Sequence, residues 1–261
     1  MKKTVTLLAS LLIALTAGAQ TINVHMTDST VVNYPLANVS YIDFTASATP
    51  NPEPGTAPEG VVAVDLGLPS GTKWANMNVG AKKMEDYGLY FAWGETVGYT
   101  SDASDGHVFD WASYKWCNGS STTLTKYCNT DSCGTVDNKT VLDVEDDAAY
   151  VNWGSAWRMP TVAEIQELID NTTSTWTTVN GVKGRRFTSK TNGNSIFLPA
   201  AGDRWNVDLI SAGSGGRYWS SSLDGSYPSG AYRLYFDSGY AFWDYYGSRG
   251  SGQSVRPVRQ N

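Results

Sequence analysis

The sequence predicts an α+β fold made of two helices and short antiparallel strands. Residues 161–171 and, less clearly, residues 144–153 have the pattern of helices. Three short runs near the C-terminus, at 217–222, 231–236 and 240–246, are rich in strand-forming residues. Gly, Ser, Pro and Asp separate these runs, which is typical of the turns in an antiparallel meander.

The chain opens with the pattern of a secretory signal peptide. Two lysines precede an apolar run at residues 5–15, and small residues at 17–19 form a cleavage site before Gln20. The apolar run is shorter than the ~18 residues expected of a membrane-spanning helix. The cleavage position has no Cys, so the sequence does not support a lipid anchor. We therefore expect residues 1–19 to be removed and the mature chain to be secreted or held at the cell surface, without membrane insertion.

A small β segment and a linker are expected next. Residues 21–34 alternate apolar and polar positions on either side of a polar tetrapeptide, which predicts a hairpin, and residues 39–44 form a further candidate strand. Four prolines among small residues mark 48–60 as a stiff, exposed linker. We thus divide the rest of the chain into a β segment at 20–47, the linker, and one well-buried domain at 61–261.

The two predicted helices differ in their start signals. Thr161 is a suitable N-cap, Glu164 follows three residues later, and four apolar residues then recur at helical spacing. The earlier helix candidate begins with Glu145, Asp146 and Asp147, and the positive end of a helix dipole favours such acidic residues.

The predicted meander has the composition of a recognition surface. In its middle run, alternate residues face opposite sides of the strand. We expect Tyr232, Leu234 and Phe236 to face the core, and Arg233, Tyr235 and Asp237 to face solvent. From residue 199 onward Tyr, Ser and Gly supply nearly half of the residues and six Arg occur, whereas Lys and Glu are absent. Binding surfaces are enriched in aromatic residues and Arg. A Tyr-rich sheet with its charges elsewhere would also fit, because strands favour aromatic residues.

The acidic residues do not define a metal site or a catalytic pair. Asp143 with the three acids at 145–147 is the best metal candidate, but the spacing lacks the alternating Asp pattern of a calcium loop. Charge at a helix N-terminus explains this cluster better. A catalytic pair that uses carboxylates such as Glu95 and Asp146 stays open, since the spacing selects no pair.

Cysteine and histidine usage offers little for catalysis. Cys117, Cys128 and Cys133 share one loop-like region, so a disulfide can form and at least one thiol is left free or intermolecular. His25 and His107 are the only histidines, which argues against a zinc site and against catalysis by a Cys–His or Ser–His pair. The net charge of −6 argues against nucleic acid as a partner. We predict no catalytic residue, no metal and no cofactor.

A series of short motifs lies in order over residues 61–259: VDLGLPSGTKWA at 64–75, NVGA at 78–81, DYGLYFAWGE at 86–95, DDAA at 146–149, WRMPT at 157–161, FLPAAG at 197–202, YWSS at 218–221 and SVRPV at 254–258. Together these motifs resemble the Fibrobacter succinogenes major paralogous domain. That family is similar to the C-type-lectin-like fold of formylglycine-generating enzymes and of diversity-generating retroelement variable proteins. The resemblance implies a compact α+β, C-type-lectin-like domain whose last strands carry a ligand surface.

The closing run also resembles the variable region of those retroelement proteins, in which Asn codons are rewritten by mutation of their adenines. Such changes cannot produce Lys, Glu, Gln, Met or Trp, and the tail contains no Lys, Glu or Met. Trp205, Trp219, Trp243 and Gln253 would then be fixed framework, with the three rings buried. The resemblance implies a variable, ligand-facing set: Arg204, Asp208, Arg217, Asp224, Tyr227, Arg233, Tyr235, Tyr240, Phe242, Asp244, Tyr245, Tyr246 and Ser248.

Two departures from related families narrow the function. Every Cys precedes Gly134, whereas formylglycine-generating enzymes carry a Cys pair near the C-terminal strands, and the Glu-Pro-Asn and Gln-Pro-Asp sugar motifs of calcium-dependent lectins are absent. We therefore predict an exported binding protein, and not an enzyme, whose partner is a surface protein or a glycan. The alternatives are a carboxylate-based carbohydrate-active enzyme and a structural subunit of a cell-surface assembly.

Overall fold

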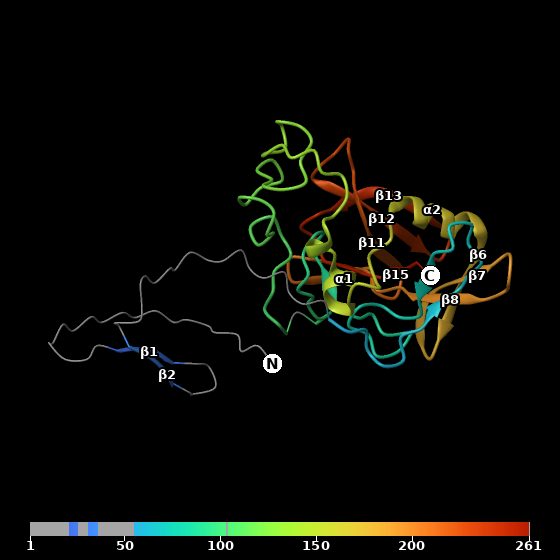
Figure 1. Cartoon of the computed structure of the whole chain (residues 1–261). Coiled ribbons are helices and arrows are strands. Elements are labelled where there is room, and N and C mark those ends of the chain that lie inside the picture. The colour runs from blue at the N-terminus through green and yellow to red at the C-terminus, as the bar shows by residue number, and fades with distance from the viewer. Residues whose placement is uncertain (1–20, 26–30, 36–54, 103, 261) are drawn as a thin grey trace. The chain divides into compact units, whose positions relative to one another are not determined.

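The computed structural model describes residues 21–25, 31–35, 55–102 and 104–260, and the chain divides into one unit at Met1–Pro50 and another at Asn51–Asn261 (Figure 1). In the first unit, β1 (Thr21–His25) pairs with β2 (Val31–Pro35) in antiparallel register, as the alternation of residues 21–34 predicts. The expected signal peptide at 1–19, the candidate strand at 39–44 and residues 48–54 of the linker lie outside the described residues.

The second unit is organised around a five-stranded sheet. Its strand order is β13 (Ala241–Ser248), β12 (Gly230–Asp237), β11 (Gly215–Leu223), β14 (Gln253–Ser254) and β5 (Tyr90–Phe91). β13, β12 and β11 pair with one another in antiparallel register, and β14 pairs with β11 in parallel. The three antiparallel strands form the meander that the sequence predicts.

Smaller sheets surround the central one. A three-stranded antiparallel sheet contains β6 (Thr172–Val179), β7 (Val182–Ser189) and β8 (Ser195–Pro199). A second three-stranded sheet has the order β15 (Val258–Arg259), β4 (Lys73–Ala75) and β3 (Ala63–Val64), and β9 (Asp203–Trp205) pairs with β10 (Asp208–Ile210).

Helices contribute little to this structure. Helix α2 (Val162–Asn171) begins at Thr161 with the expected capping box and packs against β12 and β13 (Figure 1). The second predicted helix is shorter than residues 144–153, because Asp147 has an extended backbone that separates the 3-10 turn η2 (Val144–Asp146) from α1 (Ala148–Trp153). In the described part of the chain, no helix is long and apolar enough to cross a membrane.

The predicted α+β, C-type-lectin-like class is therefore wrong, and the described chain is mainly β. Its two α-helices have six and ten residues, whereas strands make up most of the regular structure. The sequence prediction left the region of β6 to β8 unassigned. There, two Thr- or Arg-containing strands of eight residues flank Asn180 and Gly181, whose φ angles of 48° and 85° fit a tight hairpin turn.

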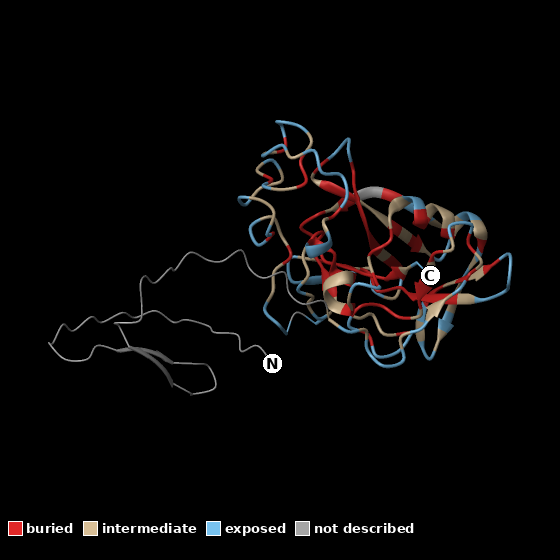
Figure 2. Cartoon of the chain, viewed as in Figure 1, coloured by how far each residue is buried: buried red, intermediate tan, exposed pale blue. Residues whose placement is uncertain are grey.

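Large rings fill the core beside the central sheet, where Figure 2 shows buried residues concentrated. Trp93 donates its indole N–H to the carbonyl oxygen of Ser220 at 2.8 Å, and Trp219 donates to that of Phe91, also at 2.8 Å. These reciprocal bonds join the segment around β5 to β11. Leu234 and Phe236 are fully buried on the opposite face of the sheet from Trp219, as the alternation in β12 predicts.

A long segment without regular structure depends on Arg249. The described residues between β5 and η2 form isolated bridges but no helix or strand. The guanidinium of Arg249 is fully buried and donates to the carbonyl oxygens of Lys126, Tyr127 and Pro228 and to the Tyr114 hydroxyl, all at 2.9–3.0 Å. This side chain thus fastens the long segment to the end of β13.

We expect Arg249→Met to lower the free energy of unfolding by about 3 kcal/mol or more, because it leaves several buried acceptors without donors. Urea unfolding followed by Trp fluorescence measures the loss. Arg186→Met is the control, since half-buried Arg186 donates one bond, to Ser195 at 3.3 Å, and should cost less than about 1 kcal/mol. Equal losses in the two variants would contradict this role of Arg249.

The N-cap of α1 adds a pH-dependent contribution to stability. The carboxylate of Asp147 accepts backbone N–H bonds from Ala149, Tyr150 and Met159 at 2.8–3.0 Å. Only 5% of Asp147 is exposed. Burial raises its pKa from 3.8 to about 6, although the backbone donors offset part of this effect.

We expect wild-type protein to lose stability relative to Asp147→Asn as the pH rises from 4 to 7. The folded state has the higher pKa, so it binds the proton more tightly, and this stabilisation is lost as the pH rises through about 6. This difference in pKa between the folded and unfolded states corresponds to a change of up to about 3 kcal/mol in the free energy of unfolding. Urea unfolding of both proteins across this pH range measures the difference, and a difference that does not change with pH would contradict the prediction.

Candidate functional site

The outer face of β12 and β13 carries three aromatic rings in mutual contact. The ring centroid of Tyr235 lies 6.2 Å from that of Tyr240 and 5.3 Å from that of Phe242, and the last two are 5.4 Å apart. Tyr240 is 55% exposed and Phe242 is 39% exposed. We call these three residues the ring surface. Exposed rings that cluster in this way are typical of binding surfaces.

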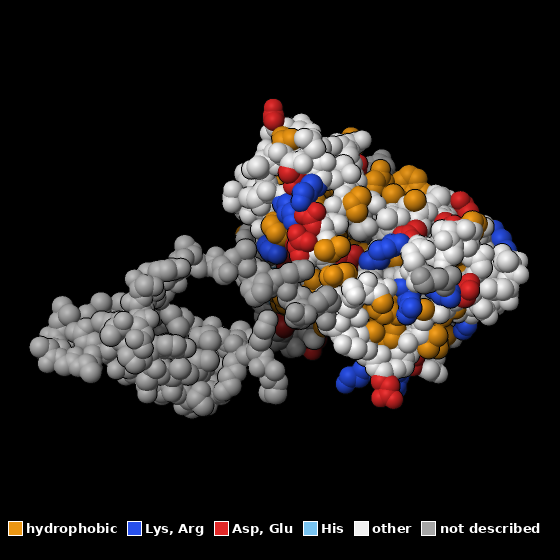
Figure 3. Space-filling view, viewed as in Figure 1, with side chains coloured by type: hydrophobic (Ala, Val, Ile, Leu, Met, Phe, Trp, Pro, Cys, Tyr) orange, Lys and Arg blue, Asp and Glu red, His pale blue; other side chains and the backbone are white. Residues whose placement is uncertain are grey.

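The strand register positions the ring surface. Tyr235 on β12 lies directly opposite Phe242 on β13, so their side chains share one face of the sheet. The intervening turn is shaped by Asp237, whose carboxylate accepts the backbone N–H groups of Gly239 and Tyr240 at 2.7 and 3.2 Å. That turn brings Tyr240 beside the other two rings. In Figure 3, hydrophobic side chains gather along the rim of the molecule where Figure 1 places β13.

Two arginines flank the ring surface, and each is paired with a carboxylate. Arg217 lies opposite Tyr235 on β11, with its guanidinium carbon 5.3 Å from the Tyr235 ring centroid, and contacts Asp203 at 3.0 Å. Arg233 binds both carboxylate oxygens of Asp244, at 2.7 and 3.2 Å. Burial raises the pKa of Asp203, while Arg217 lowers it in part. The ion pairs hold both guanidinium groups in place beside the rings.

Five residues of the predicted ligand-facing set therefore come together: Arg217, Arg233, Tyr235, Tyr240 and Phe242. Asp244 is 6% exposed and belongs to the same group through Arg233. Sequence reasoning missed Asp203, because its contact with Arg217 depends on the approach of β9 to β11. A bridge between Gly202 and Gly216 marks that approach, and no local pattern in the sequence indicates it.

Two other members of the set lie inside the protein. Arg204 is fully buried, and its guanidinium donates to the carbonyl oxygens of Thr100 and His107 at 2.8 and 2.9 Å. Asp224 is 2% exposed, and its carboxylate accepts the backbone N–H of Ser226 at 2.9 Å. Both side chains bind loops and do not face solvent, so the ligand-facing expectation does not fit their positions.

The remaining members are spread over other positions. Asp208 is exposed on β10, Tyr227 is 63% exposed in the connection between β11 and β12, and Ser248 is half-buried at the end of β13. Tyr245 and Tyr246 belong to β13, but their side chains lie outside the described part of the structure.

One of the expected framework rings is not buried. Trp219 is fully buried and Trp205 is half-buried, but Trp243 is 37% exposed. Its ring centroid lies 5.5 Å from that of Tyr232, and its indole N–H donates to the side chain of Gln166 on α2. Helix α2 covers Trp243 only in part, because this residue lies on β13 at the edge of the sheet.

The predicted acidic cluster is engaged by protein groups. Asp143 contacts Lys126 and Lys139 at 2.6 and 2.5 Å, and Asp146 contacts Lys126 at 2.6 Å and accepts the Tyr127 hydroxyl at 2.6 Å. Among the residues that the structure describes, no three His, Cys, Asp or Glu side chains form a group suited to a metal ion.

Glu95 and the cysteines, the other side chains considered for catalysis, also lie among groups of the protein itself. Glu95 accepts the backbone N–H of Lys115 at 2.8 Å, and burial raises its pKa. Cys128 and Cys133 form a disulfide with their Cα atoms 6.0 Å apart, and Cys117 is free. The pairing leaves one thiol over, as the odd number of cysteines predicts.

Comparison with protein families matches residues 110–259 to the Lcl C-terminal domain. The chain belongs to this family. The matched residues make up more than half of the chain and include the whole meander with its ring surface. Membership of the Lcl C-terminal domain family supports the paralogous-domain part of the resemblance. Searches of curated proteins and of solved structures gave no match.

Proposed function

We propose that this protein is an exported recognition protein that binds a surface protein or a glycan through the ring surface. The observation that carries the proposal is the mutual contact of Tyr235, Tyr240 and Phe242 on an exposed sheet face, with Arg217 and Arg233 beside them. Aromatic residues and Arg supply most hot spots in binding interfaces.

The geometry favours binding with a small loss of side-chain freedom. Cross-strand packing restricts the rings before a partner arrives, and a Tyr side chain has only two rotatable angles to fix. The two ion pairs, Arg217 with Asp203 and Arg233 with Asp244, also place their guanidinium groups in advance. Burial of aromatic area and directional hydrogen bonds, more than net charge, would then provide the affinity.

Export is part of the same proposal. The signal peptide expected at residues 1–19 directs the chain out of the cytoplasm. Membership of the Lcl C-terminal domain family fits a secreted or surface-exposed protein of a paralogous family. A recognition surface that faces the surroundings of the cell would have direct access to a surface protein or a glycan.

We expect Tyr240→Ala and Phe242→Ala each to weaken binding tenfold or more, because each truncation removes an exposed ring from the contact. Residues 20–261, purified and labelled, are screened on arrays of glycans and of cell-surface proteins, and dissociation constants are measured for the hits. Tyr227→Ala is the matched control, since it removes a 63% exposed ring that lies in another segment. A screen without hits, or equal affinities for all variants, would sink the proposal.

We further propose that a retroelement diversifies the exposed residues of this surface. The structure sharpens the expected pattern, because a buried Arg204 that binds two loop carbonyls tolerates little variation, whereas Tyr240 and Phe242 can change without a core defect. Sequencing of this gene and its neighbourhood across one culture should reveal a template repeat that differs mainly at adenines. Codons 240 and 242 should vary and codon 204 should not, and a single invariant copy without a template would rule out diversification.

A further inference from the structure

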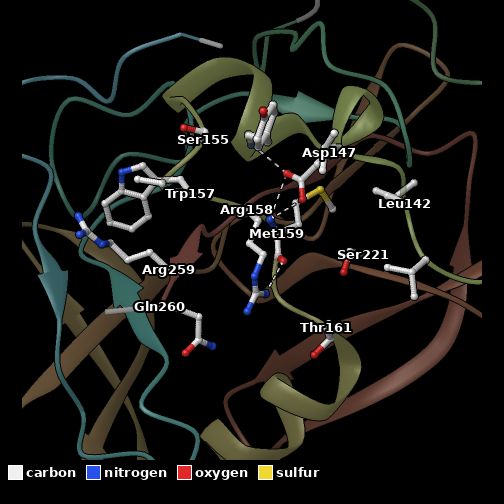
Figure 4. A pocket seen from close by; sticks show the side chains of 14 residues that line it. Leu142, Asp147, Ser155, Trp157, Arg158, Met159, Thr161, Ser221, Arg259 and Gln260 are labelled. Atoms are coloured by element: carbon white, nitrogen blue, oxygen red, sulfur yellow. Dashed lines mark hydrogen bonds between the residues drawn. The ribbon is translucent and has the colours of Figure 1, made fainter. Parts of the chain in front are cut away.

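A second candidate binding site lies away from the ring surface, in a cavity lined by α1, the start of α2 and β15. Its volume is about 540 Å³, which is within the range of small-ligand sites. Figure 4 shows Trp157 and Arg259 together on one side, Leu142 and Ser221 on the other, and Arg158 between them. The cavity and the ring surface share no residue.

The two arginines that line the cavity differ in their charge compensation. Arg158 donates to both carboxylate oxygens of Glu164, at 2.7 and 2.5 Å, so its charge is neutralised within the protein. Arg259 has its guanidinium carbon 5.6 Å from the ring centroid of Trp157. In the described chain, no carboxylate lies within ion-pair distance of Arg259, and no acceptor is hydrogen-bonded to its guanidinium. Within the part of the chain that the structure describes, the positive charge of Arg259 is therefore uncompensated.

An acidic side chain in the cavity does not cancel this charge. Asp147 is the only acid among the described lining residues, and just 5% of it is exposed. Its carboxylate accepts backbone N–H bonds from Ala149, Tyr150 and Met159, and Figure 4 shows it beside Met159. The cavity thus presents to an entering ligand a guanidinium that contacts Trp157 and that no carboxylate of the described residues neutralises.

The rest of the lining is largely apolar. Val141 and Val144 are 49% and 54% exposed at the rim, and Trp157, Leu142 and Met159 lie deeper. The N–H donors of a guanidinium lie in its own plane, so a guanidinium beside an indole ring can still bind a planar carboxylate through two of them. A ligand with one carboxylate and one apolar body therefore complements this lining in both charge and hydrophobicity.

We propose that this cavity binds a small organic carboxylate that carries an aromatic or aliphatic body. The carboxylate pairs with Arg259, and the body packs against Trp157 and the valines at the rim. This inference is independent of the proposed function, since either site can bind its partner without the other.

Isothermal titration of the full mature chain with 3-phenylpropionate at low salt tests the proposal. We expect saturable binding, and we expect 3-phenylpropionamide, which has the same shape without the charge, to bind at least tenfold more weakly. Arg259→Gln should weaken the binding of 3-phenylpropionate at least tenfold. Arg186→Gln removes the same charge from β7, outside the cavity, and should leave the affinity unchanged.

A second variant keeps the test decisive if Arg259→Gln affects folding. Val144→Asp places a negative charge at a 54% exposed rim position, so it should weaken binding of the carboxylate at least fivefold without disturbing the core. The proposal is overturned if 3-phenylpropionate shows no saturable binding up to about 10 mM. It is also overturned if the amide binds equally well, or if the two cavity variants bind like Arg186→Gln.

Discussion

Three buried guanidinium groups that bind backbone carbonyls hold this largely irregular chain to its sheets. Arg204, Arg249 and Arg256 are fully buried, and each donates to carbonyl oxygens of segments far away in the sequence. A domain with few helices leaves many loop carbonyls in its interior, and each needs a donor. Arg suits this task because it carries five N–H donors in a fixed plane. Burial disfavours a charged guanidinium, and it lowers the pKa of Arg256 to about 10.

This internal scaffold covers one part of a meander face and leaves the ring surface on the same face exposed for binding. Trp219 lies opposite Arg233 in the covered part, and Trp219 and Arg249 fix that part through bonds to β5 and to the long segment. The register of β12 with β13 then determines where Tyr235 and Phe242 stand. Exposed side chains on a face fixed in this way can change with little effect on the fold, because their contacts are mainly with one another. A recognition surface and a stable core can thus occupy the same three strands.

Structural features that depend on neighbouring residues could be predicted from the sequence, whereas features that depend on contacts between distant segments could not. Helix α2 was predictable because Thr161 and Glu164 form a local capping box, and the meander because alternation and turns are local. The fold class was wrong because the Thr-rich β6 hairpin was not recognised and Asp147 shortens α1. Arg composition likewise could not separate Arg204, which binds two loop carbonyls, from Arg217, which stands beside a ring. That distinction depends on which loop packs over each strand.

The pairing of charges, more than their sum, distinguishes the two candidate sites. The whole chain has a net charge of −6, yet Arg217 and Arg233 at the ring surface are each balanced by a carboxylate, whereas no carboxylate of the described residues balances Arg259 in the cavity. A balanced surface has to gain its affinity from buried area and from hydrogen-bond geometry, which salt weakens little. An uncompensated guanidinium attracts an anion through charge, and salt screens that attraction wherever solvent reaches it. The same residue type therefore supports two kinds of recognition in one domain, and the presence or absence of a carboxylate partner decides which.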